Sequence, residues 1–421
     1  MSPHKVSTLS SLQDVSSYDI SPNGFLPSGP PLAYLPDGYY QPWDNIIHYL
    51  PTLLDTKQLR SIVENLHVLS TSHLHSDVEW RRAYLVLTMI AQAYIWQGPE
   101  PSERLPPAIA IPLLAVSKHL QVLPVATYAA LNLWNWEPTA PGLDITNPDN
   151  LRSLHTFTGT DDESWFYVVS NAMEARGGAM VQSILKAMQA VEQHDTDCVV
   201  HSLVSLEKSL FEIGQLLERM YERCDPQVFY YHIRPFLAGS KNMAAAGLPN
   251  GVFFDEGNGK GKWRTYRGGS NGQSSLIQFF DAVLGVQHLK TEEFHEEMRK
   301  YMPGGHARFL EDVIEAANIR GYVSSYPENA ELTTAFNEAI KALTSFRDKH
   351  LQLVSRYIII PSRLPPPAKK PARQDLAAAT TTAARRGSST QELVGTGGTK
   401  LLPFLKQARN DTTATALDRP L

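Results

Sequence analysis

Apolar residues recur at steps of three and four near the end of the chain, which is the spacing of one face of an amphipathic helix. They are Phe336, Ile340, Leu343, Phe346, Val354 and Tyr357. His350 falls on the same face. A buried imidazole needs a hydrogen-bond partner or a metal ion. From spacing alone a hydrogen-bonded core histidine is the favoured interpretation, and a proximal haem ligand is the alternative.

The same helical period runs through most of the chain and predicts an all-α protein with two lobes. In the first, smaller lobe the helical stretches are residues 56–70, 79–96 and 106–120. In the second lobe they are residues 164–195 and 201–224, a helix that begins near Leu276, and a short final helix at 400–409. Asp225 and Pro226 supply the N-cap and the first-turn proline of a further helix in the second lobe.

Shifts in composition divide the chain. Residues 1–31 are rich in Ser, Pro and Gly and are expected to be a loosely ordered lead-in, followed by a small helical domain at 32–157 and a large helical domain at 158–421. Within the large domain, residues 242–275 read as a Gly-rich irregular insertion. A low-complexity stretch at about 362–398 is expected to be a mobile loop.

The net charge and the cysteine content indicate which classes of binding partner and which cellular compartment to expect. The net charge is −5, with a pI near 6.3, so the chain has no basic footprint for nucleic acid or for an anionic membrane. Only Cys198 and Cys224 occur, which suits a reducing compartment and argues against a thiolate zinc site. The N-terminus lacks a secretory pattern and no apolar run reaches the length of a membrane span. We therefore expect a cytoplasmic protein with small-molecule partners.

Two further stretches carry candidate chemistry. Phe229 and Tyr230 give a helix an aromatic wall, and Arg234 follows within about a turn, which would suit a planar substrate with a carboxylate. The alternative is a core helix whose arginine caps or reaches solvent. "RGGSNGQSS", residues 267–275, places glycines and hydroxyls before the N-terminus of a helix, where free backbone N–H groups attract anions. The alternative interpretation of this stretch is a flexible linker. Arg347 would suit a haem propionate or be a surface charge.

Three stretches taken together resemble the indoleamine 2,3-dioxygenase family. They are "GGSNGQSSLIQFFDAVLGVQH", "RKYMPGGHARFLEDV" and "ALTSFRDKHLQLVSRYIIIP", the last followed by "GTGGT". The resemblance is strongest from about Phe229 to Pro361 and reaches back to "PVATYAALNLWNW" and "DESWFYVVSNAMEA". It identifies the chain as a member of this family, with fungal members as the expected relatives.

The resemblance implies a haem b site. His350 matches the proximal ligand of the haem iron, and Arg347 matches the arginine at a haem propionate. Gly269, Ser270 and Asn271 match the loop over the haem edge. The helix would then bury the imidazole because haem is part of its core.

The resemblance also implies the substrate pocket. Phe229 matches the aromatic residue that packs on the indole ring, and Arg234 matches the arginine that holds the substrate carboxylate. The other matched positions are Tyr128, Phe166, Ser170, Ser270 and Thr396 in "GTGGT", which belongs to a loop that closes over the substrate. Two residues depart from the family pattern: Tyr230 replaces the second phenylalanine of the usual pair, and Leu131 replaces the cysteine of mammalian members.

The implied reaction inserts both atoms of O₂ across the C2–C3 bond of L-tryptophan and gives N-formylkynurenine, the first step of the kynurenine pathway toward NAD. No protein residue is expected to act as an acid or base, and an electron donor would keep the iron ferrous. We expect a monomer that binds neither nucleic acid nor membrane. One alternative is a haem protein of the same fold with low dioxygenase activity, acting as a sensor or on another indole; another is a haem-free helical scaffold.

Overall fold

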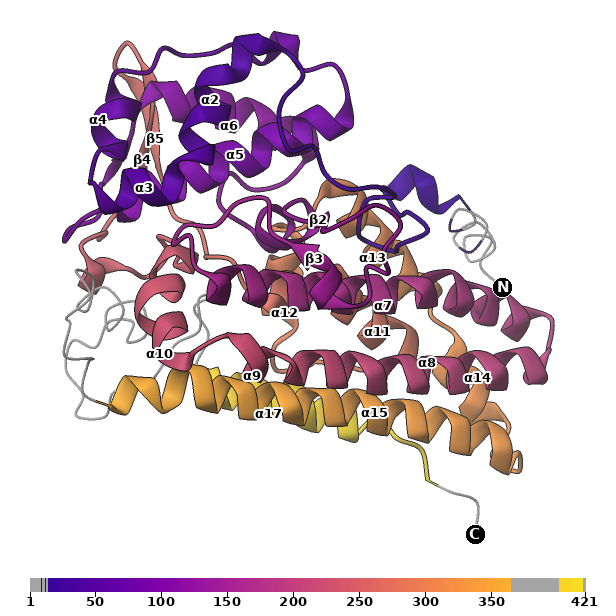
Figure 1. The fold of residues 1–421 in the computed structure, drawn as a ribbon. Helices are drawn as coiled ribbons and strands as arrows, with labels where there is room; N and C mark the ends of the chain where they lie inside the picture. The colour runs from indigo at the N-terminus through magenta and orange to yellow at the C-terminus, as the bar shows by residue number, and fades with distance from the viewer. Residues whose placement is uncertain (1–8, 10–11, 13, 365–400, 419–421) are drawn as a thin grey trace.

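The computed structural model describes residues 9, 12, 14–364 and 401–418, and within them helices dominate (Figure 1). The upper part of the molecule in Figure 1 holds the helices of the first lobe. They are α2 (Gln41–His48), α3 (Leu50–Asp55), α4 (Leu59–Glu64), α5 (Asp77–Trp96) and α6 (Pro107–Leu120). Every residue of α5 from Arg82 onward is buried, so this helix is the centre of the lobe. The predicted all-α, two-lobed fold is confirmed.

The large lobe is built on three long helices that lie side by side: α7 (Asp161–Glu192), α8 (Thr196–Glu218) and α15 (Ala330–Val354). The shorter helices around them are α9 (Met220–Arg223), α10 (Pro226–Val228), α11 (Ser275–Leu284), α12 (Glu292–Arg299), α13 (Gly304–Ala316), α14 (Ile319–Ser325) and α17 (Leu401–Thr413). The apolar face predicted for α15 is buried. Helix α17 packs along α15.

Capping explains where several helices begin. The Thr160 hydroxyl accepts a hydrogen bond from the backbone N–H of Glu163 at 3.3 Å at the start of α7. The Asp225 carboxylate accepts from the N–H groups of Gln227 and Val228, at 2.7 and 3.1 Å. The N-cap predicted at Asp225 is therefore confirmed.

The first predicted helix, at 56–70, is much shorter than expected, because α4 spans only Leu59–Glu64. Lys57 has a left-handed φ of 58°, so the helix can begin only after this residue. At the other end, the Asn65 side chain donates to the carbonyl of Ser61 at 2.8 Å and so competes with continuation of the helix.

The expectation of an irregular insertion at 242–275 is wrong. Strands β4 (Val252–Gly257) and β5 (Lys260–Arg264) form an antiparallel hairpin, and β1 (Arg104–Leu105) pairs parallel to β4. Both residues of the connecting turn, Asn258 and Gly259, have positive φ, at 53° and 72°, as a two-residue hairpin turn requires. The hairpin lies beside the helices of the first lobe in Figure 1, although its sequence falls within the large domain. A second small sheet pairs β2 (Glu137–Pro138) with β3 (Leu151–Arg152).

The described part of the N-terminal lead-in is packed rather than loose. Phe25 and Leu26 are each only 1% exposed, and the Tyr18 hydroxyl donates to a carboxylate oxygen of Asp312 on α13 at 2.5 Å. Gly24 has a φ of 67° and lies so close to Gly178 on α7 that a Cβ on Gly24 would be 2.4 Å from the Cα of Gly178. Only glycine fits at this contact.

None of the helices in the described part of the chain is both long and apolar enough to cross a membrane.

Candidate active site

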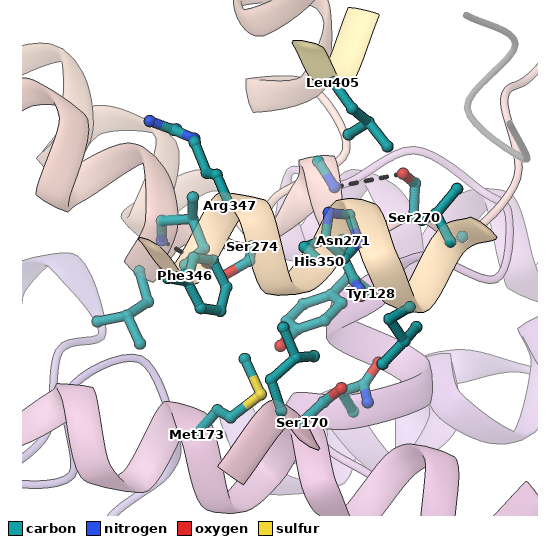
Figure 2. A pocket seen from close by; sticks show the side chains of 18 of the residues that line it. Tyr128, Ser170, Met173, Ser270, Asn271, Ser274, Phe346, Arg347, His350 and Leu405 are labelled. Atoms are coloured by element: carbon teal, nitrogen blue, oxygen red, sulfur yellow. Dashed lines mark hydrogen bonds between the residues drawn. The ribbon is translucent and has the colours of Figure 1, made fainter. Parts of the chain in front are cut away.

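One pocket in the large lobe contains the predicted site residues that the structure describes (Figure 2). These lining residues are Tyr128, Phe166, Ser170, Phe229, Arg234, Gly269, Ser270, Asn271, Arg347 and His350. The cavity has a volume of about 230 Å³, many times the space that one water molecule needs. Thr396 lies outside the described residues. The pocket thus unites residues from α7, α15 and the Gly-rich loop that are far apart in the sequence.

His350 projects from α15 into this pocket (Figure 2). Its imidazole makes no hydrogen bond to any residue in the described part of the chain. Burial, with a contribution from the positive charge of Arg347, lowers the pKa of His350 to about 4. The imidazole is therefore neutral at physiological pH and has a lone pair available to a metal. The alternative interpretation, a core histidine held by a hydrogen bond, lacks a hydrogen-bond partner for His350 among the described residues.

Arg347, one helical turn before His350, is held by two partners. Its Nη2 donates to both carboxylate oxygens of Asp281, at 2.8 and 2.7 Å, and its Nη1 donates to the hydroxyl of Thr412 on α17. Although burial alone would raise the pKa of Asp281, the Arg347 guanidinium and the imidazole of His288 lower it well below its usual range. Because a guanidinium has five N–H groups, these bonds leave the Nε–H and one Nη1–H for a further acceptor.

A buried carboxyl group in the lining, Glu174, was not anticipated. Its Oε1 accepts hydrogen bonds from the hydroxyls of Tyr128 and Ser274, at 2.9 and 2.7 Å. Its Oε2 is buried without a hydrogen-bond partner. Burial raises the pKa of Glu174 to about 7. Glu174 follows Ser170 by four residues on α7, so helical spacing from a predicted site residue was the signal that could have found it.

Aromatic rings form one wall of the pocket. The Phe166 and Phe229 ring centroids are 5.0 Å apart with the ring planes tilted by 59°, and the Phe229 ring meets Tyr357 edge-on at 5.7 Å. Stretches of π-helix, a geometry that is frequent at functional sites, supply much of this region. They are Ala129–Leu133, which follows Tyr128, Phe229–Ile233 and Ser355–Ile359.

Arg234 follows the second π-helical stretch and is fully buried in the pocket lining. Burial lowers the pKa of this guanidinium to about 10, so it stays charged at neutral pH. Its terminal carbon lies 6.0 Å from the centroid of the Tyr230 ring. Tyr230 itself is not a lining residue; it packs with Tyr231 behind the wall. The family difference at Tyr230 therefore lies next to Arg234 and does not change the surface of the cavity.

The Gly-rich loop is held by close backbone contacts. A Cβ at Gly268 would lie 1.9 Å from the carbonyl oxygen of Leu237, so only glycine fits there. Gln273 ties the loop to Tyr128, because its Oε1 accepts from the Tyr128 backbone N–H and its Nε2 donates to the Gly268 carbonyl, both at 2.9 Å. The other departure, Leu131, packs against this loop, since a Cβ at Gly269 would be 2.9 Å from its side chain.

The residues present fit haem. A neutral, unbonded imidazole faces a mainly apolar pocket of the kind that encloses cofactors, and the partly free guanidinium of Arg347 lies one turn away. Among the described residues no group of three or more His, Cys, Asp and Glu side chains could hold a bare metal ion.

Several lining residues were missed by sequence reasoning. Among them are Glu174, Asp281, Phe294, His295 and the α17 residues Leu401, Phe404, Leu405 and Ala408. A single Asp inside the apolar helix α11 was the only local signal for Asp281. For the α17 residues the signal was their spacing, since the steps are three, one and three.

Comparison with known proteins fits this site. The family model "Indoleamine 2,3-dioxygenase" matches residues 14–415. An indoleamine 2,3-dioxygenase of Penicillium citrinum is 42% identical over 416 residues, which cover 96% of this chain and 89% of the relative. The indoleamine 2,3-dioxygenase of Saccharomyces cerevisiae is 39% identical, with 96% of this chain and 93% of the relative covered. A 6-hydroxytryptophan 2,3-dioxygenase of Fusarium equiseti is 38% identical, with 95% and 97% covered.

The family model and these relatives cover nearly the whole chain, including every described residue of the pocket. The resemblance inferred from sequence motifs is confirmed, and the enzyme is an oxidoreductase of the dioxygenase type that acts on tryptophan or a related indole with haem iron. The chain belongs to the indoleamine 2,3-dioxygenase family.

Proposed function

We propose that this enzyme converts L-tryptophan and O₂ to N-formylkynurenine, with His350 as the proximal ligand of haem b. The observation that carries the proposal is the pairing of two groups in one pocket: a neutral imidazole without a hydrogen-bond partner among the described residues, and a buried guanidinium, Arg234, that stays charged. The first suits an iron ligand, and the second suits the carboxylate of an amino acid.

Haem held by His350 would supply the ferrous iron that activates O₂, both atoms of which end in the product. Arg347 would direct its remaining N–H groups to a propionate, while Asp281 and Thr412 fix its orientation. The glycine loop at Gly269, Ser270 and Asn271 would lie at the haem edge. The Ser270 hydroxyl accepts from the backbone N–H of Gly272 at 3.2 Å, which shapes this turn.

The remaining residues would bind and orient the amino acid. Arg234, which is fully buried, would hold the carboxylate by charge-assisted hydrogen bonds, which are stronger away from water. Phe166 and Phe229 would bound the indole ring on one side and Tyr128 on another, with Ser170 nearby on α7. Orientation of two reactants in a dry site is a large part of what an enzyme can supply to such a reaction. The closing role of Thr396 stays a prediction.

In the cell this reaction would be the first step of the kynurenine route toward NAD, and an electron donor would keep the iron ferrous. The monomeric state and the cytoplasmic location stay predictions from the sequence, as does the expectation that no protein group acts as an acid or base.

The direct test is to express the chain with a haem precursor, reduce it with ascorbate and methylene blue, and record the Soret band and the absorbance of N-formylkynurenine. A Soret band together with product is the expected result. A Soret band without product would favour the sensor alternative, and absence of a Soret band would refute haem binding at His350.

A second candidate substrate is a hydroxylated indole, because the Fusarium equiseti relative is named a 6-hydroxytryptophan 2,3-dioxygenase. The kcat/KM values for L-tryptophan and 6-hydroxytryptophan, measured on one preparation, decide between them. A higher value for the hydroxylated substrate would reassign the physiological substrate while leaving the haem site as proposed.

A further inference from the structure

The C-terminal helix α17 forms part of the pocket through one face. Leu401, Phe404, Leu405 and Ala408 line the pocket, and their spacing places them on one stripe of the helix. The same stripe continues one turn later in two polar residues, Asp411 and Thr412. The apolar part of the stripe covers the pocket, and the polar end ties the helix to side chains beside it.

Both polar residues bind a buried charge cluster next to the pocket. Thr412 accepts from Arg347, as described above. The Asp411 carboxylate lies 3.1 Å from Nδ1 of His288, whose Nε2 lies 3.2 Å from the carboxylate of Asp281. His288 therefore bridges two carboxylates, one on α11 and one on α17, and its side chain is only 7% exposed.

With both carboxylates ionised, this geometry makes His288 an imidazolium. An ionised carboxylate only accepts hydrogen bonds, and only the protonated ring donates from both nitrogens. Burial alone would lower the pKa of His288, but the Asp281 carboxylate, with help from Asp411, raises it above its ordinary value of 6.5. The ring stacks on His295 at 4.3 Å, where burial and the charge of His288 lower the pKa of His295 to about 4. One member of the stacked pair is charged and the other neutral.

We propose that His288 and Asp411 are positioning residues that fasten α17 to the Arg347–Asp281 pair and so hold one wall of the haem and substrate pocket in place. This inference rests on the proposed function for the identity of what the wall encloses. It adds two residues that do not line the pocket. A loosened α17 would let haem leave faster, because Leu401, Phe404, Leu405 and Ala408 would withdraw from the pocket together.

The inference carries a pH dependence whose sign follows from the groups around His288. They are Asp281 on α11, Asp411 on α17, His295 on α12 and Arg347 on α15. Because the pKa of His288 is raised in the folded protein, the imidazolium stabilises the docked helix fully below about pH 6.5. That contribution is lost as the pH rises through the folded pKa.

The test uses the full-length, haem-loaded protein and two variants, His288→Gln and Asp411→Asn. Local opening of α17 is followed by hydrogen–deuterium exchange of peptides from residues 401–413, with rates divided by the intrinsic rate at each pH. Haem loss is followed separately by transfer to excess apomyoglobin. Asp348→Asn is the matched control, because Asp348 on α15 and Arg409 on α17 form a partly exposed ion pair between these two helices, at 3.5 Å, with side chains 45% and 35% exposed.

We expect both variants to open α17 and to release haem about tenfold faster or more at neutral pH, since each change removes the largely buried ion pair that joins Asp411 on α17 to His288. Asp348→Asn should change either rate by no more than about threefold, as is usual for a surface pair. In the wild type, opening should increase as the pH rises above about 6.5, and this increase should be absent in His288→Gln. The double variant should open no more than the larger single variant, because the two changes remove one interaction.

Unchanged exchange in Asp411→Asn, or an equal effect of Asp348→Asn, would overturn the inference. Asp411→Asn keeps the test decisive if His288→Gln does not fold, because the Asp411 side chain is partly exposed whereas that of His288 is not. Exchange at α17 reports on the inference even in a preparation that makes no product. Failure of the proposed function and failure of the inference are thus separate outcomes.

Discussion

Replacing Glu174 with Gln should change how the stability of the protein depends on pH. Glu174 is 2% exposed, and its Oε1 accepts from two hydroxyls while its Oε2 has no hydrogen-bond partner. Burial raises the pKa of Glu174 from 4.5 to about 7. A carboxyl whose pKa is raised on folding favours the folded state fully below its unfolded pKa, and that contribution is lost as the pH rises through the folded value.

The size of this loss follows from the two pKa values. At a pH well above both, keeping the ionised carboxylate buried costs about 3 kcal/mol relative to keeping the acid buried. Between about pH 5 and about pH 9, the wild type should lose roughly 2 to 3 kcal/mol from this group. The amide of Gln does not ionise. The free energy of unfolding of the variant should therefore rise relative to that of the wild type by the same amount over this pH interval.

The measurement is the free energy of urea unfolding of both proteins across this pH interval, with the slope against urea checked at each pH because a two-lobed chain can unfold in more than one step. Glu192→Gln is the control, since Glu192 is the exposed last residue of the same helix. Only the change with pH is informative, because the amide N–H₂ adds a constant cost where Oε2 lies. Parallel curves for the wild type and Glu174→Gln would refute the assignment of a buried, titrating carboxyl to this pocket.

Three further changes test the site. His350→Ala should abolish the Soret band while far-UV circular dichroism stays that of a helical protein, whereas His201→Ala on the exposed face of α8 should keep the band; a normal Soret band in His350→Ala would disprove the ligand assignment. Arg234→Gln should raise the KM for L-tryptophan about tenfold to a hundredfold for each charge-assisted hydrogen bond lost, with haem retained, and an unchanged KM would show that the carboxylate binds elsewhere. Gly268→Ala should lower the melting temperature, because its Cβ would be 1.9 Å from the carbonyl oxygen of Leu237; a wild-type melting curve would contradict this contact.

The long helices could be predicted from the sequence because their period is local. The residues of the α15 stripe are separated by steps that helix geometry alone fixes, and Phe336, Ile340 and Leu343 are buried as predicted. The motif resemblance extended this to the site and selected residues that the structure brings to one pocket. Residue type and spacing were sufficient wherever a single element carried the signal.

The hairpin was missed for a compositional reason. Residues 242–275 contain many glycines, and this hid the Asn258–Gly259 dipeptide, which is a strong signal for a two-residue hairpin turn. The π-helical stretches Ala129–Leu133, Phe229–Ile233 and Ser355–Ile359 were missed because an i→i+5 turn leaves no distinct pattern in a short stretch of sequence. Both the hairpin and the π-helical stretches are defined by backbone hydrogen bonds, which the order of residue types does not reveal.

The charge cluster was unpredictable for a different reason. Arg347 and Asp281 are 66 residues apart, and His288 and Asp411 are 123 residues apart. No rule of spacing relates such pairs, and nothing in the local sequence matches one of these residues to another. Only the fold, which places α11, the loop after it, α15 and α17 within side-chain reach of one another, brings them together.

The balance of charge in this cluster explains how it can lie beside an apolar pocket. Arg347 and His288 carry positive charges, Asp281 and Asp411 carry negative charges, and each charge contacts one of the opposite sign. Paired in this way, three largely buried ionised groups and the partly exposed Asp411 avoid the penalty of an isolated buried charge. The field of Arg347 still reaches His350 and opposes its protonation. The arrangement that fastens α17 therefore also helps to keep the imidazole of His350 neutral, which is the state that an iron ligand requires.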